Sequence, residues 1–474
     1  MTLEQILAIV IFLGMFITII IGKVHRFIPA LIGAALTSIM VLAIVEAGYH
    51  ELWKVLRLYD FIEPSWWYAK EAAEASGIAN GVAGAPEVGG INWQTIVFIG
   101  GMMTMVEGLG AVGFFRWLCL YVAKIVHYKV VPILIAFMLL SGFLSMFIDS
   151  ITVLLFLATV TIELARLLKF DPVPVIIAEI FAANTGGSAT MCGDPPNIII
   201  GTHSFIVDGA VHHWTFFDFV TNTGPIAWIG MLVTLGLFYL FFRKILTKPY
   251  PSNSSDTSPN QYPEPREAIV NPTLFRIQAA IFILVVILLV SHAQTGLSVA
   301  LIGCIAASLT LLASWRGAFH VIKGVDWRTL LFFLGLFTCV GGLEVTGVLK
   351  MLADYIGEVS GGSLVIMIPF ILWISAFASA VVDNIPFAAT MCPIIGGLSG
   401  GDIAVLGPLS WTLALGTDIG GNATPIGASA NVVGTAIADR EGYPITWGRF
   451  CKYALPAMII VVGLCYLYLI ARYA

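Results

Sequence analysis

Hydrophobic residues in this chain come in runs of about twenty, separated by short polar or charged segments. Two such runs open the sequence, at 4–22 and 28–46, and the pattern continues to the C-terminus. An α-helix of this length is what is needed to cross the hydrocarbon core of a bilayer. The pattern therefore predicts an all-α polytopic membrane protein.

Further apolar runs predict the remaining helices. In the first half they lie at 93–112, 131–148, 151–167, 173–204 and 216–242, and in the second half at 274–292, 297–315, 328–346, 364–398, 409–438 and 453–471. Amphipathic helices are expected at 114–128 and 348–362. The runs 131–168 and 364–398 each have an aspartate in the middle and no charged loop, so we expect two re-entrant hairpins with tips at Asp149 and Asp383.

The run at 173–204 is interrupted by residues that do not sustain an ordinary helix. Glycines and small polar residues fill 184–190, and 193–197 contains two consecutive prolines. Glycine is conformationally permissive and proline removes a backbone donor, so the segment predicts a helix broken in the middle. Unpaired backbone at bilayer depth is tolerated only where it is buried or lines a cavity, and the break therefore predicts a binding site.

The same pattern returns 234 residues later in the chain. The pairs that coincide without a gap include Gly186/Gly420, Gly187/Gly421, Ala189/Ala423, Thr190/Thr424, Gly193/Gly427, Asn197/Asn431, Trp93/Trp327 and Asp149/Asp383. One offset that holds over about a hundred residues indicates two homologous halves. We predict repeats at 1–246 and 273–474, joined by a flexible cytoplasmic linker at 247–272 that is rich in Pro, Ser and Asn. The second repeat should have its own broken helix at 409–438.

Each repeat contains five predicted crossings, which is an odd number, so the two copies should lie inverted relative to each other. Lysine and arginine accumulate in cytoplasmic segments of membrane proteins. With the N-terminus outside, 18 of the 23 Lys and Arg residues fall in segments assigned to the cytoplasm. This bias predicts that both termini lie outside the cell membrane or inner membrane.

Composition excludes a soluble protein. Of the 474 residues, 59% are hydrophobic and only 11% are charged, which is too few charges to solvate a globular surface. The seven cysteines show no paired spacing, and no nucleophile–base pair or phosphate-binding loop is visible. We therefore expect no enzymatic activity, no catalytic residues, no cofactor and no nucleic-acid partner, but contact with membrane lipid.

Four carboxylates stand at the predicted tips and breaks: Asp149, Asp194, Asp383 and Asp418. No lysine or arginine lies in those stretches. A carboxylate in a membrane interior costs several kcal/mol unless it is paired, protonated or bound to a cation. The pattern favours Na⁺ or H⁺ as coupling ions and argues against an anionic substrate. The alternative is that these residues cap half-helices, for which Asp194, before two prolines, is the best candidate.

Neutral polar groups and glycine backbone complete the predicted site. These candidates are Ser150, Asn184, Thr185, Gly187, Thr190, Asn197, Asn384, Gly421, Asn422, Thr424, Ser429 and Asn431. Their oxygens suit a hard cation, whereas helix N-termini suit an anion, so the backbone alone leaves both open. Outside the site, Glu163 and Glu179 are expected to pair with Arg166 or Lys169.

At these motifs the chain resembles the ion-transporter superfamily. The motifs are 147–152, 178–179, 184–190, 193–197, 384–387, 420–424 and 427–431. The resemblance is greatest to the branch that holds arsenite permeases, sodium/proton antiporters and the melanosomal P protein, and it extends to the related divalent anion:sodium symporters. It covers nearly the whole chain from about Leu31.

The resemblance implies a homodimer that works by an elevator mechanism. A scaffold would comprise 1–129 and 273–362, and a transport part would comprise 130–242 and 363–474. By analogy with the dicarboxylate members, Na⁺ ligands would fall on Asp149, Ser150, Asn184 and Gly187, and on Asp383, Asn384, Asp418 and Asn422. The aspartates at both hairpin tips differ from the neutral tips of those members and argue against di- and tricarboxylate transport.

Three functions are compatible with the sequence. The simplest is Na⁺/H⁺ exchange, in which Asp149 and Asp383 alternately carry the two ions. A second is H⁺- or Na⁺-coupled transport of an oxyanion or organic carboxylate, including arsenite, which as neutral As(OH)₃ could contact Cys192 or Cys392. A third is an anion channel, which differs from a carrier because it cannot accumulate its substrate against a gradient.

Overall fold

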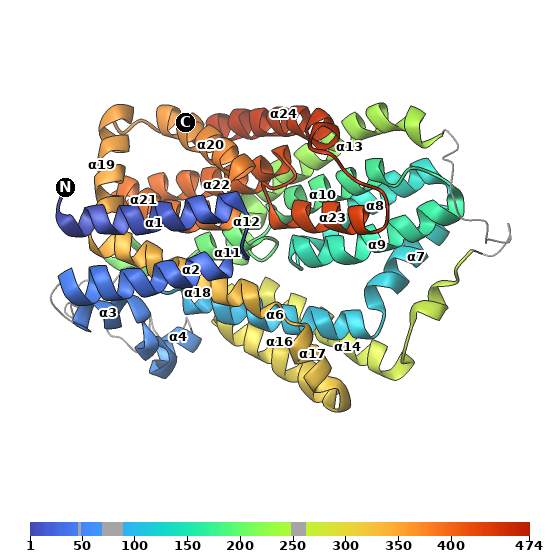
Figure 1. Cartoon of the computed structure of the whole chain (residues 1–474), viewed down its shortest axis with the longest axis horizontal. Helices are drawn as coiled ribbons and strands as arrows, with labels where there is room; N and C mark the ends of the chain where they lie inside the picture. The colour runs from blue at the N-terminus through green and yellow to red at the C-terminus, as the bar shows by residue number, and fades with distance from the viewer. Residues whose placement is uncertain (46–48, 69–88, 248–261) are drawn as a thin grey trace.

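The computed structural model describes residues 1–45, 49–68, 89–247 and 262–474, and it shows a helical bundle (Figure 1). Within these ranges the named strands are β1 (Phe205–Val207) and β2 (Ala210–His212), which form one antiparallel hairpin. By length and apolar composition, eight described helices could cross a membrane, or ten if two bent helix pairs count as one span each. The predicted helical membrane fold is thus confirmed, apart from this small hairpin.

The predicted helices of the first half are present with shifts of a few residues at their ends. They are α1 (Leu3–Ile21), α2 (Phe27–Leu36) with the π-helix η1 (Thr37–Val45), α3 (Tyr49–Leu56), η2 (Leu58–Ile62), α4 (Pro64–Trp67), α6 (Trp93–Ala111), α7 (Phe114–Ile125), α8 (Val130–Leu144), α9 (Ser150–Leu168), α10 (Val173–Gly187), α11 (Pro195–Thr202), α12 (Phe216–Asn222) and α13 (Gly224–Leu246).

The second half repeats this order. It contains η3 (Pro265–Ala268), α14 (Pro272–Val290), α15 (His292–Thr295), α16 (Val299–Ala313), η4 (Trp315–Gly317), α17 (Ala318–Gly324), α18 (Trp327–Val345), α19 (Val348–Ser360), α20 (Leu364–Val381), α21 (Asn384–Ser399), α22 (Ile403–Gly420), η5 (Gly421–Ala423), α23 (Ser429–Arg440) and α24 (Trp447–Tyr473).

Equivalent positions use the same local chemistry in both halves. The side chain of Asn92 caps α6 by accepting from the Thr95 amide, and that of Asp326 caps α18 by accepting from the Thr329 amide. The next helices, α7 and α19, each begin directly after a glycine with positive φ. The two halves therefore share this local chemistry at positions that the 234-residue offset relates. The inverted orientation of the copies in the membrane stays a prediction.

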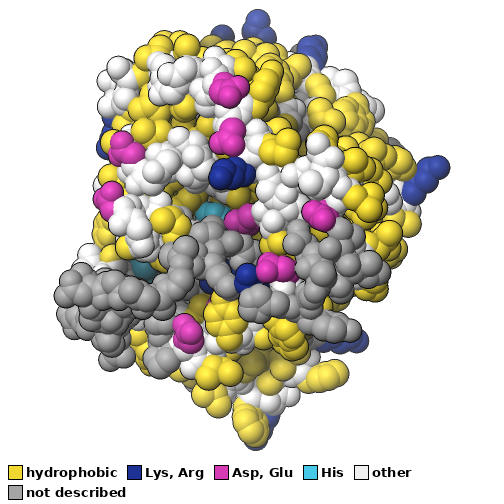
Figure 2. All heavy atoms as spheres, turned by 90° about the vertical axis from the view of Figure 1, so that its left-hand side faces the viewer, with side chains coloured by type: hydrophobic (Ala, Val, Ile, Leu, Met, Phe, Trp, Pro, Cys, Tyr) yellow, Lys and Arg dark blue, Asp and Glu magenta, His cyan; other side chains and the backbone are white. Residues whose placement is uncertain are grey.

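The outer helices carry apolar side chains on their exposed surface. Only 17% of the apolar window of α1 and 22% of that of α14 is buried within the chain, whereas 83% of the window that begins at α22 is buried. Ile6, Val10 and Leu13 of α1 are exposed. Lipid tails would cover such a surface. Figure 2 shows the end of the molecule at the left of Figure 1, where separate acidic side chains stand among many hydrophobic ones.

The two halves exchange their short half-helices at the centre. The first-half helix α11 packs on α21 of the second hairpin, and the second-half helix α23 packs on α9 and α10. Both breaks therefore lie between the two hairpins, in the middle of the bundle (Figure 1). This exchange brings together polar residues that are more than 180 positions apart in the sequence.

The first break begins later than the sequence predicted. Residues 184–187 belong to α10, which is wholly buried and ends at Gly187, and the non-helical segment runs from 188 to 194. The helix survives because its glycines allow close packing. A Cβ on Gly186 would lie 2.2 Å from the Gly142 carbonyl oxygen, and one on Gly420 would lie 2.3 Å from Ala376 Cα. Glycine here serves helix contact as much as helix termination.

The predicted flexible linker is partly ordered. Residues 262–271 lie alongside α7. The Lys124 ammonium contacts the Glu264 carboxylate at 2.8 Å, and the Tyr128 hydroxyl donates to the Pro263 carbonyl at 2.8 Å. Residues 262–271 of this linker therefore have fixed contacts with α7 and with Tyr128, which follows it. The part at 248–261 lies outside the described residues.

Replacing Gly186 by alanine should destabilise the protein, because the added methyl group cannot fit between α10 and α8. We expect a loss of about 1–3 kcal/mol, measured as a lower midpoint of thermal unfolding in detergent. The matched control is Gly236→Ala in α13, where no heavy atom lies within 4 Å of the new Cβ. Equal midpoints for the two variants would contradict the close packing described here.

Candidate functional site

Asp194 joins the two hairpin tips. Its Oδ1 accepts a hydrogen bond from the Ser150 hydroxyl at 2.6 Å, and its Oδ2 accepts one from the Asn384 amide at 3.3 Å. Ser150 begins α9 and Asn384 begins α21, so the donors come from opposite halves. Asp194 is only 1% exposed. It occupies the N-cap position of α11 without capping it through its side chain, so the expectation of a capping role was wrong.

Asp149 does cap its helix. Its Oδ1 accepts from the Thr152 backbone amide at 2.9 Å and its Oδ2 from the Thr152 hydroxyl at 2.8 Å. The side chain also lines a small, mainly apolar cavity between α6 and the first hairpin, which Phe98 and Thr329 help to enclose. The capping alternative is therefore confirmed for Asp149, and ion binding by its carboxylate stays a prediction.

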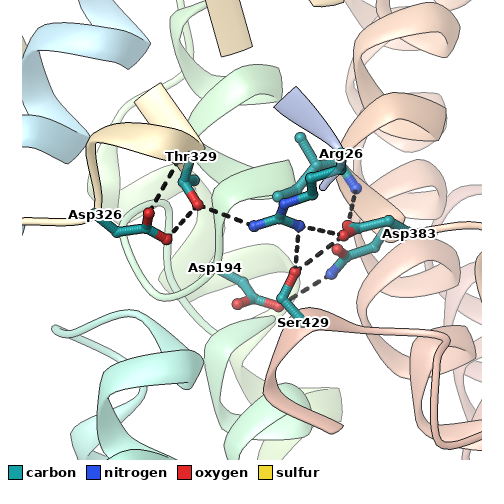
Figure 3. A network of polar contacts seen from close by, with 8 residues as sticks. Arg26, Asp194, Asp326, Thr329, Asp383 and Ser429 are labelled. Atoms are coloured by element: carbon teal, nitrogen blue, oxygen red, sulfur yellow. Dashed lines mark hydrogen bonds and ion pairs between the residues drawn. The ribbon is translucent and has the colours of Figure 1, made fainter. Parts of the chain in front are cut away.

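Asp383 pairs with Arg26, which lies in the turn between α1 and α2 (Figure 3). The Arg26 guanidinium contacts Asp383 Oδ2 at 2.5 Å and donates to the Ser429 hydroxyl at 2.6 Å through the same nitrogen. Its second terminal nitrogen donates to Thr329 Oγ1 at 3.0 Å. Asp383 also caps α21 through the Ile385 amide. The expectation that the site lacks a cationic side chain was therefore wrong.

The two breaks meet through a buried group of amides. The Asn184 amide donates to Asn422 Oδ1 at 3.0 Å and to Asn431 Oδ1 at 2.8 Å. The Asn422 amide in turn donates to the Thr185 hydroxyl at 3.4 Å. All four side chains are fully buried. Residues predicted separately in each half thus form one continuous polar centre.

Each break is closed by an asparagine at an equivalent position. The Asn197 amide donates to the carbonyls of Gly187 and Thr190, both at 3.0 Å. The Asn431 amide donates to the carbonyls of Gly421 and Thr424, both at 2.7 Å. These bonds satisfy backbone acceptors that the broken helices leave unpaired, which would otherwise be costly in a buried position.

Thr190 and Thr424 add a second matched contact in the two halves. The Thr190 hydroxyl donates to the Met146 carbonyl and the Thr424 hydroxyl to the Ala380 carbonyl, each at 2.5 Å. Met146 and Ala380 lie near the end of the first helix of their hairpins, α8 and α20. Each break is thereby fixed to the hairpin of its own half. The two threonines predicted as site residues therefore donate to backbone carbonyls in the structure.

Asp418 is the carboxylate with the least compensation. It is fully buried, and among the described residues neither of its oxygens accepts a hydrogen bond of good geometry. Asn197 and Asp194 lie within its electrostatic reach. Asp194 in turn interacts with Asp149 and Asp383. The four aspartates singled out in the sequence therefore belong to one electrostatic cluster.

The two sodium ligand sets implied by the resemblance stay predictions. Two of their members contact other residues in the structure: Asn184 donates to side-chain amides of the second half, and Asp383 pairs with Arg26. Within the described residues, no three His, Cys, Asp or Glu side chains come close enough to hold a metal ion between them. Any cation bound here would depend on amide, hydroxyl and carbonyl oxygens as well as carboxylates.

A further buried carboxyl lies outside this cluster. Glu179 is fully buried in α10 and accepts from the Thr161 hydroxyl at 2.5 Å. The expected partners are engaged elsewhere, since Arg166 binds Glu441 and Glu163 binds Arg116. The predicted pairing of these glutamates was therefore wrong, because α10 turns Glu179 inward.

Sequence reasoning missed Arg26 and its partner Thr329. Arg26 was counted as a loop charge that orients the first two helices in the membrane. Its contact with Asp383 spans 357 positions in the sequence, so spacing alone gives no signal for it. The signal for Thr329 was present, because the capping bond with Asp326 fixes the residue at the start of α18, beside the hairpin tip.

Comparisons with known proteins agree with this architecture. A model of the citrate transporter family matches residues 16–416. A 46 kDa membrane protein of Mycobacterium leprae is 34% identical over 386 residues, which cover 81% of this chain and 87% of that protein. An uncharacterized transporter of Mycobacterium tuberculosis is 33% identical over 404 residues, which cover 84% and 91%. The mouse P protein is 27% identical, with 97% of this chain covering 59% of its length.

Two solved structures share the fold. The YdaH transporter of Alcanivorax borkumensis has a TM-score of 0.53 at 15% identity, covering 80% of this chain and 84% of that one. MtrF of Neisseria gonorrhoeae, from a class of antimetabolite efflux pumps, has a TM-score of 0.51 at 12% identity, covering 80% and 81%. At such low identity these matches support the membrane-transporter fold alone.

Replacing Asn197 or Asn431 by alanine should destabilise the protein, because each variant strands two buried carbonyls, and the Asn431 variant also removes an acceptor of the Asn184 amide. We expect a loss of about 1–3 kcal/mol for each, read from thermal unfolding in detergent. Thr435→Ala on α23 is the control, since that hydroxyl bonds only within its own helix. A large loss at one asparagine and none at the other would contradict the matched roles.

Proposed function

We propose that this chain, which belongs to the citrate transporter family, is a secondary active carrier that couples substrate movement to Na⁺ or H⁺. Family membership makes it a multi-pass membrane transporter, and the coupling ion is the proposed part. The observation that carries the proposal is Asp194, a buried carboxylate held between the tips of both hairpins.

Asp194 links a change of charge to a change of contacts. Its two hydrogen-bond donors sit at the first turns of α9 and α21, which belong to different repeats. A proton or a sodium ion at this carboxylate would reduce its negative charge and so weaken both bonds, since hydrogen bonds to a charged acceptor are stronger than those to a neutral one. Loading the carboxylate therefore alters the force that holds the tips together, which is what a coupled carrier requires.

Asp418 strengthens the case for a cation. Like charges repel strongly in a low-dielectric interior, and Asp194 and Asp418 interact with each other while Asp418 has no hydrogen-bond donor of good geometry among the described residues. A proton or a metal cation shared by the pair would remove this cost. We therefore propose that the coupling ion binds within the cluster that these two carboxylates form with Asp149 and Asp383, with Na⁺/H⁺ exchange as the simplest cycle.

We further propose that the cycle is an elevator movement in a homodimer. The scaffold would comprise 1–129 and 273–362, and the transport part 130–242 and 363–474, with both termini outside. The exposed apolar faces of α1 and α14 are available to lipid or to a second copy, and the contacts of Arg26 with Asp383 and Ser429 join a segment assigned to the scaffold to segments assigned to the transport part. These assignments support the mechanism without deciding the direction of transport.

A second candidate is cation-coupled uptake or efflux of an anion such as citrate. The specific observation in its favour is Arg26, because a partly exposed guanidinium can bind a carboxylate in place of Asp383. The family description points the same way. Liposomes containing the purified protein distinguish the two candidates, since only the second accumulates labelled citrate when a Na⁺ or pH gradient is imposed.

Replacing Asp194 or Asp418 by asparagine should uncouple the carrier, because the amide keeps the size of the side chain and removes its charge. In liposomes with an imposed Na⁺ or pH gradient, we expect at least about a tenfold fall in gradient-driven flux, equivalent to about 1.4 kcal/mol. The measurement records Na⁺ movement and the internal pH of the same liposomes over time.

The matched control is Asp354→Asn, an exposed carboxylate on α19 that should leave the flux unchanged. Coupled flux that survives in both Asp194→Asn and Asp418→Asn, at wild-type rates, would rule out the proposed role of this pair. Flux that the wild-type protein drives with neither Na⁺ nor H⁺ would rule out the proposed function as a whole.

A further inference from the structure

Arg26 fills a set of oxygens that could hold a cation of another kind. Its guanidinium lies against a carboxylate oxygen of Asp383 and the hydroxyl oxygens of Ser429 and Thr329, at 2.5, 2.6 and 3.0 Å (Figure 3). The Ser429 hydroxyl also lies 2.9 Å from the same Asp383 oxygen. Carboxylate and hydroxyl oxygens grouped in this way are the ligands that Na⁺ and other hard cations take.

The local structure leaves the Arg26 side chain available for this role. Arg26 lies at the N-cap of α2 and makes no capping bond with its side chain. It follows a turn that begins at Gly22, a glycine with positive φ that ends α1. The guanidinium lies 5.0 Å from the centre of the Phe332 ring, which supports it from one side. A long, flexible side chain on a short turn acts as a tethered cation.

The pairing is strong enough to form and weak enough to exchange. The side chains of Arg26 and Asp383 are 19% and 14% exposed, so water reaches both partners. A partly hydrated ion pair gains less than a dry one and loses less when a competing ion replaces one partner. Asp194 lies within electrostatic reach of Asp383, and Asp418 within reach of Asp194, so the negative potential that attracts a cation extends beyond this pair.

We propose that Arg26 is a built-in competitor for the coupling cation: its guanidinium occupies the Asp383–Ser429–Thr329 site, and the cation must displace it to bind. The inference rests on the proposed function and adds the regulation of its cation site. Arg26 thereby sets the apparent affinity of the carrier for the cation, as a tethered ligand at a high local concentration does.

Displacement also breaks contacts between the two proposed moving parts. Arg26 and Thr329 belong to segments assigned to the scaffold, whereas Asp383 and Ser429 belong to segments assigned to the transport part. In the absence of the cation, Arg26 therefore holds the parts together. When the cation takes Asp383, this hold is released, so binding and permission to move become one event.

Charge removal at Arg26 tests the proposal. The variants are Arg26→Gln, Arg26→Lys, and Arg449→Gln as a control that removes a different ion pair, with Asp171, outside the network. Purified protein in detergent is titrated with Na⁺ at fixed pH, with choline as the replacement ion, and the midpoint of thermal stabilisation is read. A second titration follows coupled flux in liposomes against pH.

Without its competitor the site should bind the cation more tightly. In Arg26→Gln we expect the half-effective Na⁺ concentration to fall about tenfold or, if the proton is the coupling ion, the midpoint of the pH profile to rise by about one unit. Arg26→Lys keeps a tethered charge and should stay near the wild type, as should Arg449→Gln. The proposal is overturned if Arg26→Gln moves neither midpoint, or if it moves either midpoint toward weaker binding.

A double-mutant comparison guards against a purely structural effect. In an Asp383→Asn background the guanidinium and the cation have both lost their shared carboxylate, so the response to the cation should be weaker than in the wild type, and adding Arg26→Gln should produce no further shift in either midpoint. A full shift in that background would overturn the proposal. Should the wild-type protein respond to neither Na⁺ nor pH, the proposed function fails and the competitor role with it. Coupled wild-type flux with unmoved midpoints in Arg26→Gln defeats the competitor role alone.

Discussion

A carboxylate inside a low-dielectric protein interior needs hydrogen-bond donors, a cation or a proton, and this requirement organises the centre of the molecule. Asp194 takes donors from both hairpin tips, Asp149 takes them from its own helix, and Asp383 takes a guanidinium from the first turn of the chain. Asp418 is left without a good donor among the described residues. Asp418 is therefore the least compensated of the four carboxylates.

The frame around these charges is neutral and repeated, whereas the charges are repeated only at Asp149 and Asp383 and not at Asp194 and Asp418. Asn197 and Asn431 close the two breaks with the same pair of bonds. The backbone of Asp194 (φ −138°, ψ 148°) matches that of its counterpart Ala428 (φ −141°, ψ 152°). The counterpart of Asp418 is likewise a neutral residue, Asn184. The carboxylates of Asp194 and Asp418 therefore have no acidic equivalent at the matching positions of the other half.

The repeat, both hairpins and both breaks were predictable because each depends on residues close together in the sequence. The 234-residue offset located α6 and α18 with the same starting residue, and hydrophobic run length located the spans. What sequence could not give is the choice of partner. The prolines after Asp194 predicted that its side chain caps α11. In the structure, however, Ser150 donates to it from its own half, and the packing of α11 on α21 brings Asn384 of the other half within hydrogen-bond distance. Arg26 was missed for the same reason.

A repeated frame with unequal charges suits a protein that must adopt two states of similar energy. If the copies are inverted, as their odd number of crossings predicts, an outward-facing and an inward-facing arrangement can use the same amide and carbonyl bonds, so the frame favours neither. The difference between the states then resides in the few groups that lack a counterpart, chiefly Asp194, Asp418 and Arg26. A bound ion shifts such an equilibrium only through its different affinity for the two states. Placing the unmatched charges at the junction of both hairpins makes that difference as large as one ion can provide.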